Sequence, residues 1–181
     1  MKNSSLLVVV DMQNDFICGS LGTKEAESIV TNAADKIRSW DGDIVFTMDT
    51  HGENYLGTSE GKKLPVLHCI KGTDGHMLHP DIDAARSERD AMCEKKSIII
   101  EKPSFGSLDL SDIIRGGQYD CIEFVGLCTD ICVISNVLIA KAASPESTIT
   151  VDASCCAGVS PESHINALRA MRSCQIDIIN E

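Results

Sequence analysis

The chain has 181 residues, with 27 acidic and 16 basic side chains and a formal net charge of −11. This length is typical of a single domain, which we predict over residues 1–181, and a hydrophobic share of 43% is enough to build a core. The negative charge argues against nucleic-acid partners, which need a dense basic surface, and against binding to an anionic membrane surface.

The amino-terminal apolar run, residues 6–10, is too short for a secretory leader. No stretch reaches the roughly 20 apolar residues of a membrane span. Nine cysteines without an export signal indicate reduced thiols, so we expect a cytoplasmic protein. Their scattered spacing, with no CxxC pair, argues against a redox or metal-storage protein.

Six short apolar and β-branched runs recur along the chain. Most are continuously apolar rather than alternating, which is typical of strands buried on both faces of a parallel sheet. The runs span residues 6–10, 44–48, 97–101, 121–125, 148–151 and 176–179.

Helical patterns lie between these runs. Residues 26–37 keep a helical spacing of apolar side chains, and the helix after residue 160 would place Ile165, Leu168 and Met171 on one face. The predicted helix caps are Ser107, Thr129 and Ser160. The alternation predicts a three-layer α/β/α fold with a doubly wound, mostly parallel, six-stranded sheet. Residues 49–80 lack a clear period, so we expect a long functional loop there.

Reactive side chains follow four of the predicted strands. In order along the chain, they are Asp11, Asp49, Lys102 and Cys132. Each alone is an ordinary turn, surface or core residue. Because ligands of open α/β sheets bind outside the carboxyl ends of the strands, the combination is much more specific than any member. We expect Cys132 in the first turn of a helix, where backbone N–H groups and a nearby lysine would favour its thiolate.

The sequence resembles the isochorismatase-like cysteine hydrolases, and within them the nicotinamidases. The resemblance covers nearly the whole chain, and its strongest motifs lie at residues 11–16 (DMQNDF) and 126–133 (GLCTDICV). The catalytic triad of this family maps onto Asp11, Lys102 and Cys132. The resemblance implies that Cys132 is the nucleophile, that Asp11 is the base, and that Lys102 holds both electrostatically.

Further site features follow from the same resemblance. It implies a cis peptide bond between Leu127 and Cys128, and an oxyanion hole formed by the backbone N–H groups of Cys128 and Cys132. A small residue is usual where this chain has Cys128, so a disulfide between Cys128 and Cys132 stays open. The expected lining of the substrate pocket is Gln13, Phe16, Phe105 and Leu127.

A metal site is expected from the nicotinamidase pattern. Asp49-x-His51 and a later Pro-x-x-His ending at His68 resemble its metal motif, and Glu60 is the best match to a further ligand, with Glu53 as the competitor. Two imidazoles and carboxylates suit Zn²⁺, Mn²⁺ or Fe²⁺, and we favour Zn²⁺ slightly. The alternative is that these histidines are loop residues without a ligand role.

Two positions depart from the nicotinamidase pattern, because Thr50 and Leu64 stand where tryptophan is frequent. The reaction class is therefore better defined than the substrate. The resemblance implies a homo-oligomeric amidohydrolase, a dimer or tetramer, that releases ammonia from nicotinamide or a similar small carboxamide through a Cys132 thioester. The alternatives are a family hydrolase acting on a carbamoyl or ureido amide or a vinyl ether, and a non-catalytic binding member of the fold.

Overall fold

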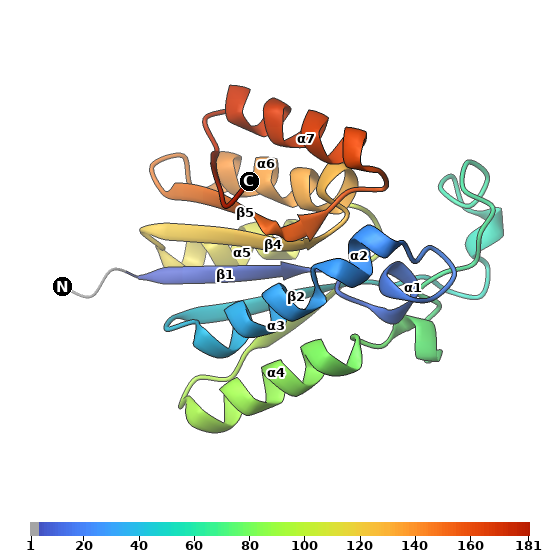
Figure 1. Cartoon of the computed structure of the whole chain (residues 1–181), viewed down its shortest axis with the longest axis horizontal. Coiled ribbons are helices and arrows are strands. Elements are labelled where there is room, and N and C mark those ends of the chain that lie inside the picture. Colours follow the sequence, from blue (N-terminus) through green and yellow to red (C-terminus); the bar gives the residue numbers. More distant parts are fainter. Residues whose placement is uncertain (1–3) are drawn as a thin grey trace.

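A computed structural model describes residues 4–181 and contains one sheet of six strands (Figure 1). The strand order is β3-β2-β1-β4-β5-β6, and every neighbouring pair is parallel. The strands are β1 (Ser5–Val10), β2 (Asp43–Asp49), β3 (Ile98–Lys102), β4 (Cys121–Leu127), β5 (Thr148–Ala157) and β6 (Asp177–Ile179). The predicted six-stranded α/β fold is confirmed, with a sheet that is entirely rather than mostly parallel.

Helices cover both faces of this sheet. They are α1 (Asn14–Ile17), α2 (Lys24–Ser28), α3 (Val30–Ser39), α4 (Pro80–Met92), α5 (Leu108–Gly117), α6 (Ile134–Ala143) and α7 (Pro161–Ser173). Shorter turns are the 3₁₀ segments η1 (Tyr55–Gly57) and η2 (Asp74–His76) and the π turn η3 (Thr129–Val133).

Strand β1 shows why the sheet has two apolar layers. Side chains alternate across a strand, so Leu7 and Val9 pack into the core beneath α3 and α4. Leu6, Val8 and Val10 pack into the other core, beneath α5, α6 and α7. All five side chains are fully buried, which explains the continuous apolar run in the sequence.

Two of the three predicted caps are confirmed. The Ser107 hydroxyl accepts a hydrogen bond at the start of α5, and the Ser160 hydroxyl does the same at the start of α7. The prediction for Thr129 is wrong, because its hydroxyl lies 2.8 Å from His164 Nδ1 and η3 begins without a side-chain cap.

Two other expectations need correction. Ile165 is 47% exposed, so it does not share the buried face of α7 with Leu168 and Met171. The sequence analysis also did not predict α4. The buried face of α4 contains Ile82, Ala85 and Arg89, a weak apolar signal for a helix of this length.

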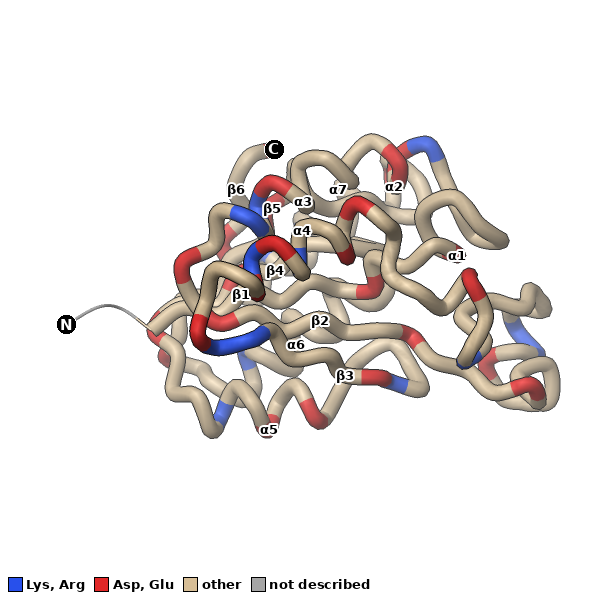
Figure 2. Tube along the Cα trace, turned by 90° about the horizontal axis from the view of Figure 1, so that it is seen from below, with Lys and Arg blue, Asp and Glu red and all other residues tan. Residues whose placement is uncertain are grey.

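The carboxyl ends of the strands lie toward the right of Figure 1, where the segment between β2 and α4 projects (teal). The strand order reverses between β1 and β4, which is the point where open α/β sheets bind ligands. In Figure 2 acidic residues (red) are spread along the molecule, and the basic residues described there (blue) are scattered among them. Among residues 4–181, no helix is long and apolar enough to cross a membrane.

Candidate active site and metal centre

Three reactive side chains meet at the carboxyl edge of the sheet. Asp11 directly follows β1, Lys102 is the last residue of β3, and Cys132 lies in η3 after β4. The Lys102 ammonium lies 2.6 Å from Asp11 Oδ2 and 3.6 Å from Cys132 Sγ. All three side chains are buried. The fold therefore brings together the residues predicted as catalytic, with the lysine contacting both others.

The backbone and its neighbours fix Asp11 and Lys102. Asp11 has φ +49°, a left-handed conformation that costs a non-glycine residue about 1–2 kcal/mol. Its backbone N–H donates to Thr47 O, and the Thr47 hydroxyl donates to Asp11 Oδ1 at 2.7 Å. The Lys102 ammonium also donates to Ser104 O at 3.0 Å. Sequence reasoning missed Thr47, although a hydroxyl within an otherwise apolar strand is a usable signal.

The turn that carries Cys132 is held by its own backbone and by α6. Cys128 O accepts hydrogen bonds from the N–H groups of Ile131 and Val133, at 3.0 and 3.1 Å. Asn136 donates to Cys132 O at 2.8 Å. Single π turns are frequent at functional sites. The sequence analysis did not anticipate this π turn or the role of Asn136.

Burial determines the protonation of the catalytic candidates. Burial and the Asp11 charge raise the pKa of Cys132 well above its usual value, and the Lys102 charge only partly opposes this. The expectation of a resting thiolate is therefore wrong, because desolvation outweighs the lysine. Burial also raises the pKa of Asp11. Burial alone would lower the pKa of Lys102, but the charges of Asp11 and Asp49 raise it, so the lysine stays an ammonium.

Four potential ligand atoms lie beside this cluster, from Asp49, His51, Glu60 and His68, all within 4.8 Å of one another. Asp49 Oδ2 lies 2.9 Å from His51 Nε2 and 3.5 Å from His68 Nε2. Glu60 Oε1 lies 3.6 and 3.8 Å from the same two nitrogens. Donors bound at about 2.1 Å around one ion would be roughly 3.0–3.4 Å apart. The Glu60 oxygen would therefore need to move only slightly closer to the two histidine nitrogens for the group to bind a metal ion.

The surroundings of these side chains also suit a metal. His51 Nε2 is buried and lies 2.9 Å from Asp49 Oδ2, so it faces the donor group. His68 Nδ1 lies 2.8 Å from Val66 O, a contact that leaves Nε2 available as a ligand atom. Burial would raise the pKa of Asp49, but hydrogen bonds from both histidines and the Lys102 charge hold it well below its usual range. Asp49 is therefore an ionised carboxylate, as metal ligation requires.

Tyr55 packs against the two histidines, and Glu53 lies outside the donor group. The Tyr55 ring is fully buried against the two histidines, with ring centroids 4.5 Å from His51 and 4.9 Å from His68. It therefore supports the histidines and does not line the cavity. Glu53 is exposed and outside the donor group, so of these two glutamates it is Glu60 that lies beside the histidines.

Gln13 does not line the substrate cavity, which corrects the sequence prediction. Its side chain is fully buried, and its amide donates to Asp49 O at 2.9 Å and to His76 O at 2.8 Å. Its carbonyl accepts from the Asp49 backbone N–H at 2.7 Å. All of these contacts are internal, so Gln13 holds the backbone of Asp49 in place.

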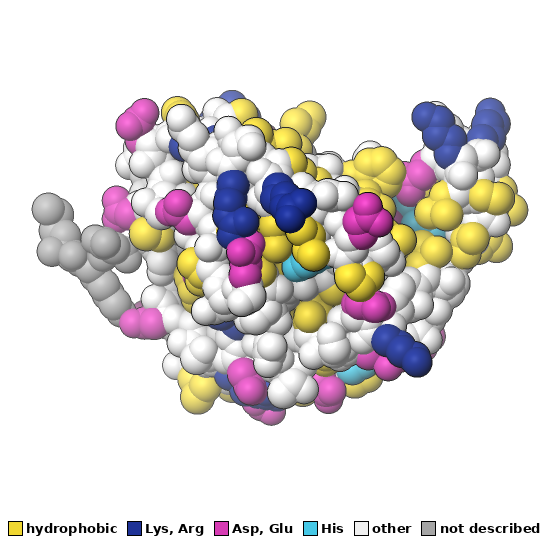
Figure 3. Space-filling model, turned by 45° about the horizontal axis from the view of Figure 1, so that its top comes forward, with side chains coloured by type: hydrophobic (Ala, Val, Ile, Leu, Met, Phe, Trp, Pro, Cys, Tyr) yellow, Lys and Arg dark blue, Asp and Glu magenta, His cyan; other side chains and the backbone are white. Residues whose placement is uncertain are grey.

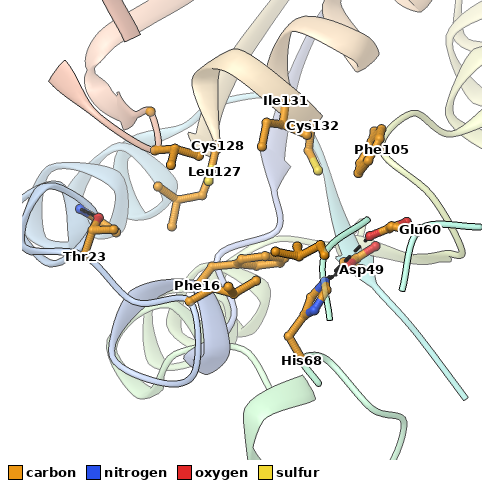
Figure 4. A pocket seen from close by; sticks show the side chains of 15 residues that line it. Phe16, Thr23, Asp49, Glu60, His68, Phe105, Leu127, Cys128, Ile131 and Cys132 are labelled. Carbon is orange, nitrogen blue, oxygen red and sulfur yellow. Dashed lines mark hydrogen bonds and ion pairs between the residues drawn. The ribbon is translucent and has the colours of Figure 1, made fainter. Parts of the chain in front are cut away.

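A cavity of about 280 Å³ opens over Cys132 (Figure 4). Phe16, Phe105 and Leu127 line it as predicted, together with Cys128. In Figure 3 a hollow between the main body and the projecting segment is bordered by apolar side chains, and a histidine is visible inside it. Sequence reasoning missed Leu21, Thr23, Ala26, Ile131, Gly158 and Val159, which also line the cavity.

The peptide bond between Leu127 and Cys128 is cis, as the resemblance implied. Cys128 lies partly buried at the cavity wall, and burial raises the pKa of its thiol to about 12. All nine cysteines lie within the described residues, and each is a free thiol.

The fold and the site define a class: a doubly wound α/β protein with a buried cysteine, lysine and aspartate beside a two-histidine donor group. The family model of the isochorismatase domain matches residues 5–180, so the chain belongs to the isochorismatase family.

The relatives of this chain share most of its length. The nicotinamidase/pyrazinamidase of Mycobacterium tuberculosis is 28% identical over 96% of this chain and 97% of that protein. The structure of pyrazinamidase/nicotinamidase from Streptococcus mutans matches with a TM-score of 0.84 and 27% identity, covering 97% of this chain and 100% of that one. The pyrazinamidase of Pyrococcus horikoshii, solved in complex with zinc, matches with a TM-score of 0.81 and 26% identity, covering 98% and 99%. The predicted family resemblance is confirmed.

Proposed function

We propose that this protein is a cysteine amidohydrolase that releases ammonia from nicotinamide or a similar small carboxamide. The observation that carries the proposal is the buried contact of the Lys102 ammonium with both the Asp11 carboxylate and the Cys132 sulfur. A nucleophile, a base and a cation in contact are the parts that acyl transfer needs. The nicotinamidase relatives support the amide as the substrate class.

The first step forms a thioester on Cys132. The Asp11 carboxylate takes the thiol proton, and the sulfur attacks the amide carbon. Asp11 then gives this proton to the nitrogen, so the C–N bond breaks and ammonia leaves. The raised pKa of Asp11 suits a base that must return its proton. Lys102 keeps its charge throughout and stabilises the ionised partners.

The second step hydrolyses the thioester. Asp11 takes a proton from a water molecule, whose oxygen attacks the thioester carbon. The C–S bond breaks, the carboxylic acid product forms, and the Cys132 sulfur regains a proton. We assign the oxyanion hole to the backbone N–H groups of Cys128 and Cys132, and each such donor contributes about 3–4 kcal/mol in comparable hydrolases.

Asp49, His51, Glu60 and His68 would hold a divalent metal, with Zn²⁺ favoured over Mn²⁺ and Fe²⁺. The zinc complex of the Pyrococcus horikoshii relative supports this choice. When bound, the ion would supply a Lewis-acid position for a ring nitrogen of the substrate. The apolar side chains of Phe16 and the half-exposed Phe105 would contact the ring itself.

The direct test is ammonia release from nicotinamide and pyrazinamide by the purified protein, before and after chelation and after return of zinc. We expect release that is lost on chelation and restored by zinc. Cys132→Ala should abolish release with metal content unchanged, whereas Cys174→Ala, at an exposed free thiol, should retain it. Absence of ammonia from both amides with zinc bound would contradict the proposal.

We also propose that the protein acts in the cytoplasm as a homo-oligomer, a dimer or a tetramer. The location rests on the many reduced cysteines, and the assembly rests on the family resemblance. Light scattering coupled to size-exclusion chromatography measures the assembly directly, and a monomer at micromolar concentration would contradict it.

A further inference from the structure

The cavity over Cys132 extends well beyond the metal-donor group. In Figure 4 its lining runs from Glu60 and His68 on the right, past Cys132, to Thr23 on the left. We call the part away from the metal donors the apolar arm, which is lined by Leu21, Thr23, Ala26, Leu127, Gly158 and Val159. It lies where α2 meets the loop after β5, because these two segments also line a smaller neighbouring pocket together.

The chemistry of the arm favours an apolar occupant. The Thr23 hydroxyl already accepts the backbone N–H of Ala26 at 3.0 Å. The backbone N–H of Val159 is bonded to Asp130 Oδ1 at 3.0 Å. The neighbouring Cys128 thiol is neutral at physiological pH. A charged or strongly polar group would therefore lose its water and gain at most the Thr23 O–H as a partner, whereas an apolar group would lose nothing.

The size of the cavity exceeds what a single ring needs. A single-ring carboxamide would fill roughly 150 Å³ at the packing density of protein interiors. The cavity holds about 280 Å³. A single ring bound between the metal donors and Cys132 therefore leaves the arm empty, with space for a second ring or a short alkyl chain.

We propose that the substrate is a carboxamide with a second apolar group, and that this group occupies the apolar arm. The inference rests on the proposed amidohydrolase function and narrows its substrate class. Val159 and Leu21 then determine specificity, because they line the arm and are far from the metal donors in the chain. Both side chains are partly or largely exposed, so larger residues fit there without disturbing the buried core.

The test compares kcat/KM of the zinc-bound protein for nicotinamide, 5-phenylnicotinamide and N-benzylnicotinamide. The two extended amides distinguish attachment at the ring from attachment at the leaving nitrogen. We expect at least one of them to match or exceed nicotinamide. Val159→Trp and Leu21→Trp should each lower kcat/KM for that amide about tenfold more than for nicotinamide. Leu138→Trp, on the exposed side of α6 and outside the cavity, is the matched control and should leave the ratio unchanged.

The outcomes separate this inference from the proposed function. If nicotinamide is hydrolysed and both extended amides fall below about 1% of its kcat/KM, the inference is overturned and the amidohydrolase function stands. Equal losses for both substrate types in the tryptophan variants would also overturn it. If none of the three amides is hydrolysed with zinc bound, the proposed function itself fails, and the inference fails with it.

Discussion

Lys102 is the residue on which the two halves of the site depend. Its ammonium lies 2.6 Å from Asp11 and 3.4 Å from Asp49, so one buried cation neutralises a carboxylate of the nucleophile cluster and one of the metal-donor group. Removing the cation would leave two buried carboxylates without their shared counter-charge. Uncompensated buried charges are costly, whereas exposed ion pairs contribute little.

Lys102→Met should therefore abolish turnover and also lower the free energy of unfolding by about 3–5 kcal/mol. The matched control is Lys71→Met, which removes an exposed partner of Glu101 and should cost less than about 1 kcal/mol. Urea unfolding followed by circular dichroism measures both variants. Equal stability of the two variants would show that Lys102 does not compensate the buried carboxylates.

The pH dependence of the reaction reports on Asp11. The base must be ionised to accept the thiol proton, so kcat/KM falls as the pH falls through the Asp11 pKa. Because burial raises this pKa above 3.8, the acid limb of the pH profile should lie above that value. Asp11→Asn should remove the limb and lower kcat/KM by roughly 10²–10⁴. An acid limb at or below 3.8 would argue against this assignment.

At the residue scale, Asp11, Asp49, Lys102 and Cys132 were predicted because strand ends meet at one edge of a parallel sheet, whereas His51, Glu60 and His68 were implied by the family resemblance. It was wrong for Gln13, because an amide can hydrogen-bond internally as easily as it can face a ligand. It was wrong about the Cys132 thiolate, since sequence does not reveal how strongly a thiol is desolvated. Glu60 and Glu53 could not be separated before the chain path between the histidines was known.

Among the elements, η3 is held in place by hydrogen bonds to α7 and to the loop between β5 and α7. Thr129 is fully buried, and its hydroxyl lies 2.8 Å from His164 Nδ1. Asp130 accepts the backbone N–H of Val159. Both contacts hold the turn that carries Cys132, so α7 positions the nucleophile although it contributes no side chain to the cavity.

Thr129→Val should therefore lower kcat about tenfold and leave KM nearly unchanged, because a small displacement of the nucleophile affects the reaction more than binding. Stability should fall by only about 1–2 kcal/mol, as expected for one buried hydrogen bond. Thr148→Val, at an exposed position of β5, is the control for the same substitution. A matching loss in KM, or recovery of kcat at lower temperature, would indicate general loosening instead.

The elements that were predicted from sequence have a stronger apolar pattern than the elements that were missed. Central strands are buried on both faces, so they appear in the sequence as continuous apolar runs that are easy to recognise. Helix α4 was missed because small and charged residues, Ala85 and Arg89, fill much of its buried face. The cap role of Thr129 failed because its hydroxyl pairs with His164, a partner that no local pattern reveals.

For the molecule as a whole, buried and bonded carboxylates determine stability in acid. Hydrogen bonds outweigh burial and hold the pKa values of Asp43, Asp90 and Asp152 below their usual range, as they do for Asp49. A lowered pKa in the folded state stabilises the protein above the unfolded value of about 3.9. That contribution is lost as the pH falls through the folded values. Asp11, with a raised pKa, acts in the opposite direction.

We therefore expect the free energy of unfolding to decrease below about pH 4. Asp152→Asn should make this decrease smaller, because it removes one titrating partner of Lys36. Urea titrations at a series of pH values measure the effect. A decrease of equal size in Asp152→Asn would contradict the assignment of acid sensitivity to this carboxylate.

Some whole-molecule properties stay predictions. The organisation as one domain over residues 1–181 rests on length, and the oligomeric state rests on the resemblance. The substrate could not be predicted from sequence because the cavity wall comes from distant segments. Leu21, Ala26 and Val159 meet only in the folded chain, and none of them belongs to a motif.

The position of β3 at the outer edge of the sheet has a consequence for how activity fails. Lys102 ends a strand that, among residues 4–181, is hydrogen-bonded on one side only, to β2. Outer strands detach in local opening events that need less free energy than unfolding of the central strands. Each such event would withdraw the shared cation while β1 and β4 stay intact. A low concentration of denaturant should therefore abolish activity reversibly while the central strands remain folded. The rate of amide hydrogen exchange along β3 should rise over the same range of denaturant.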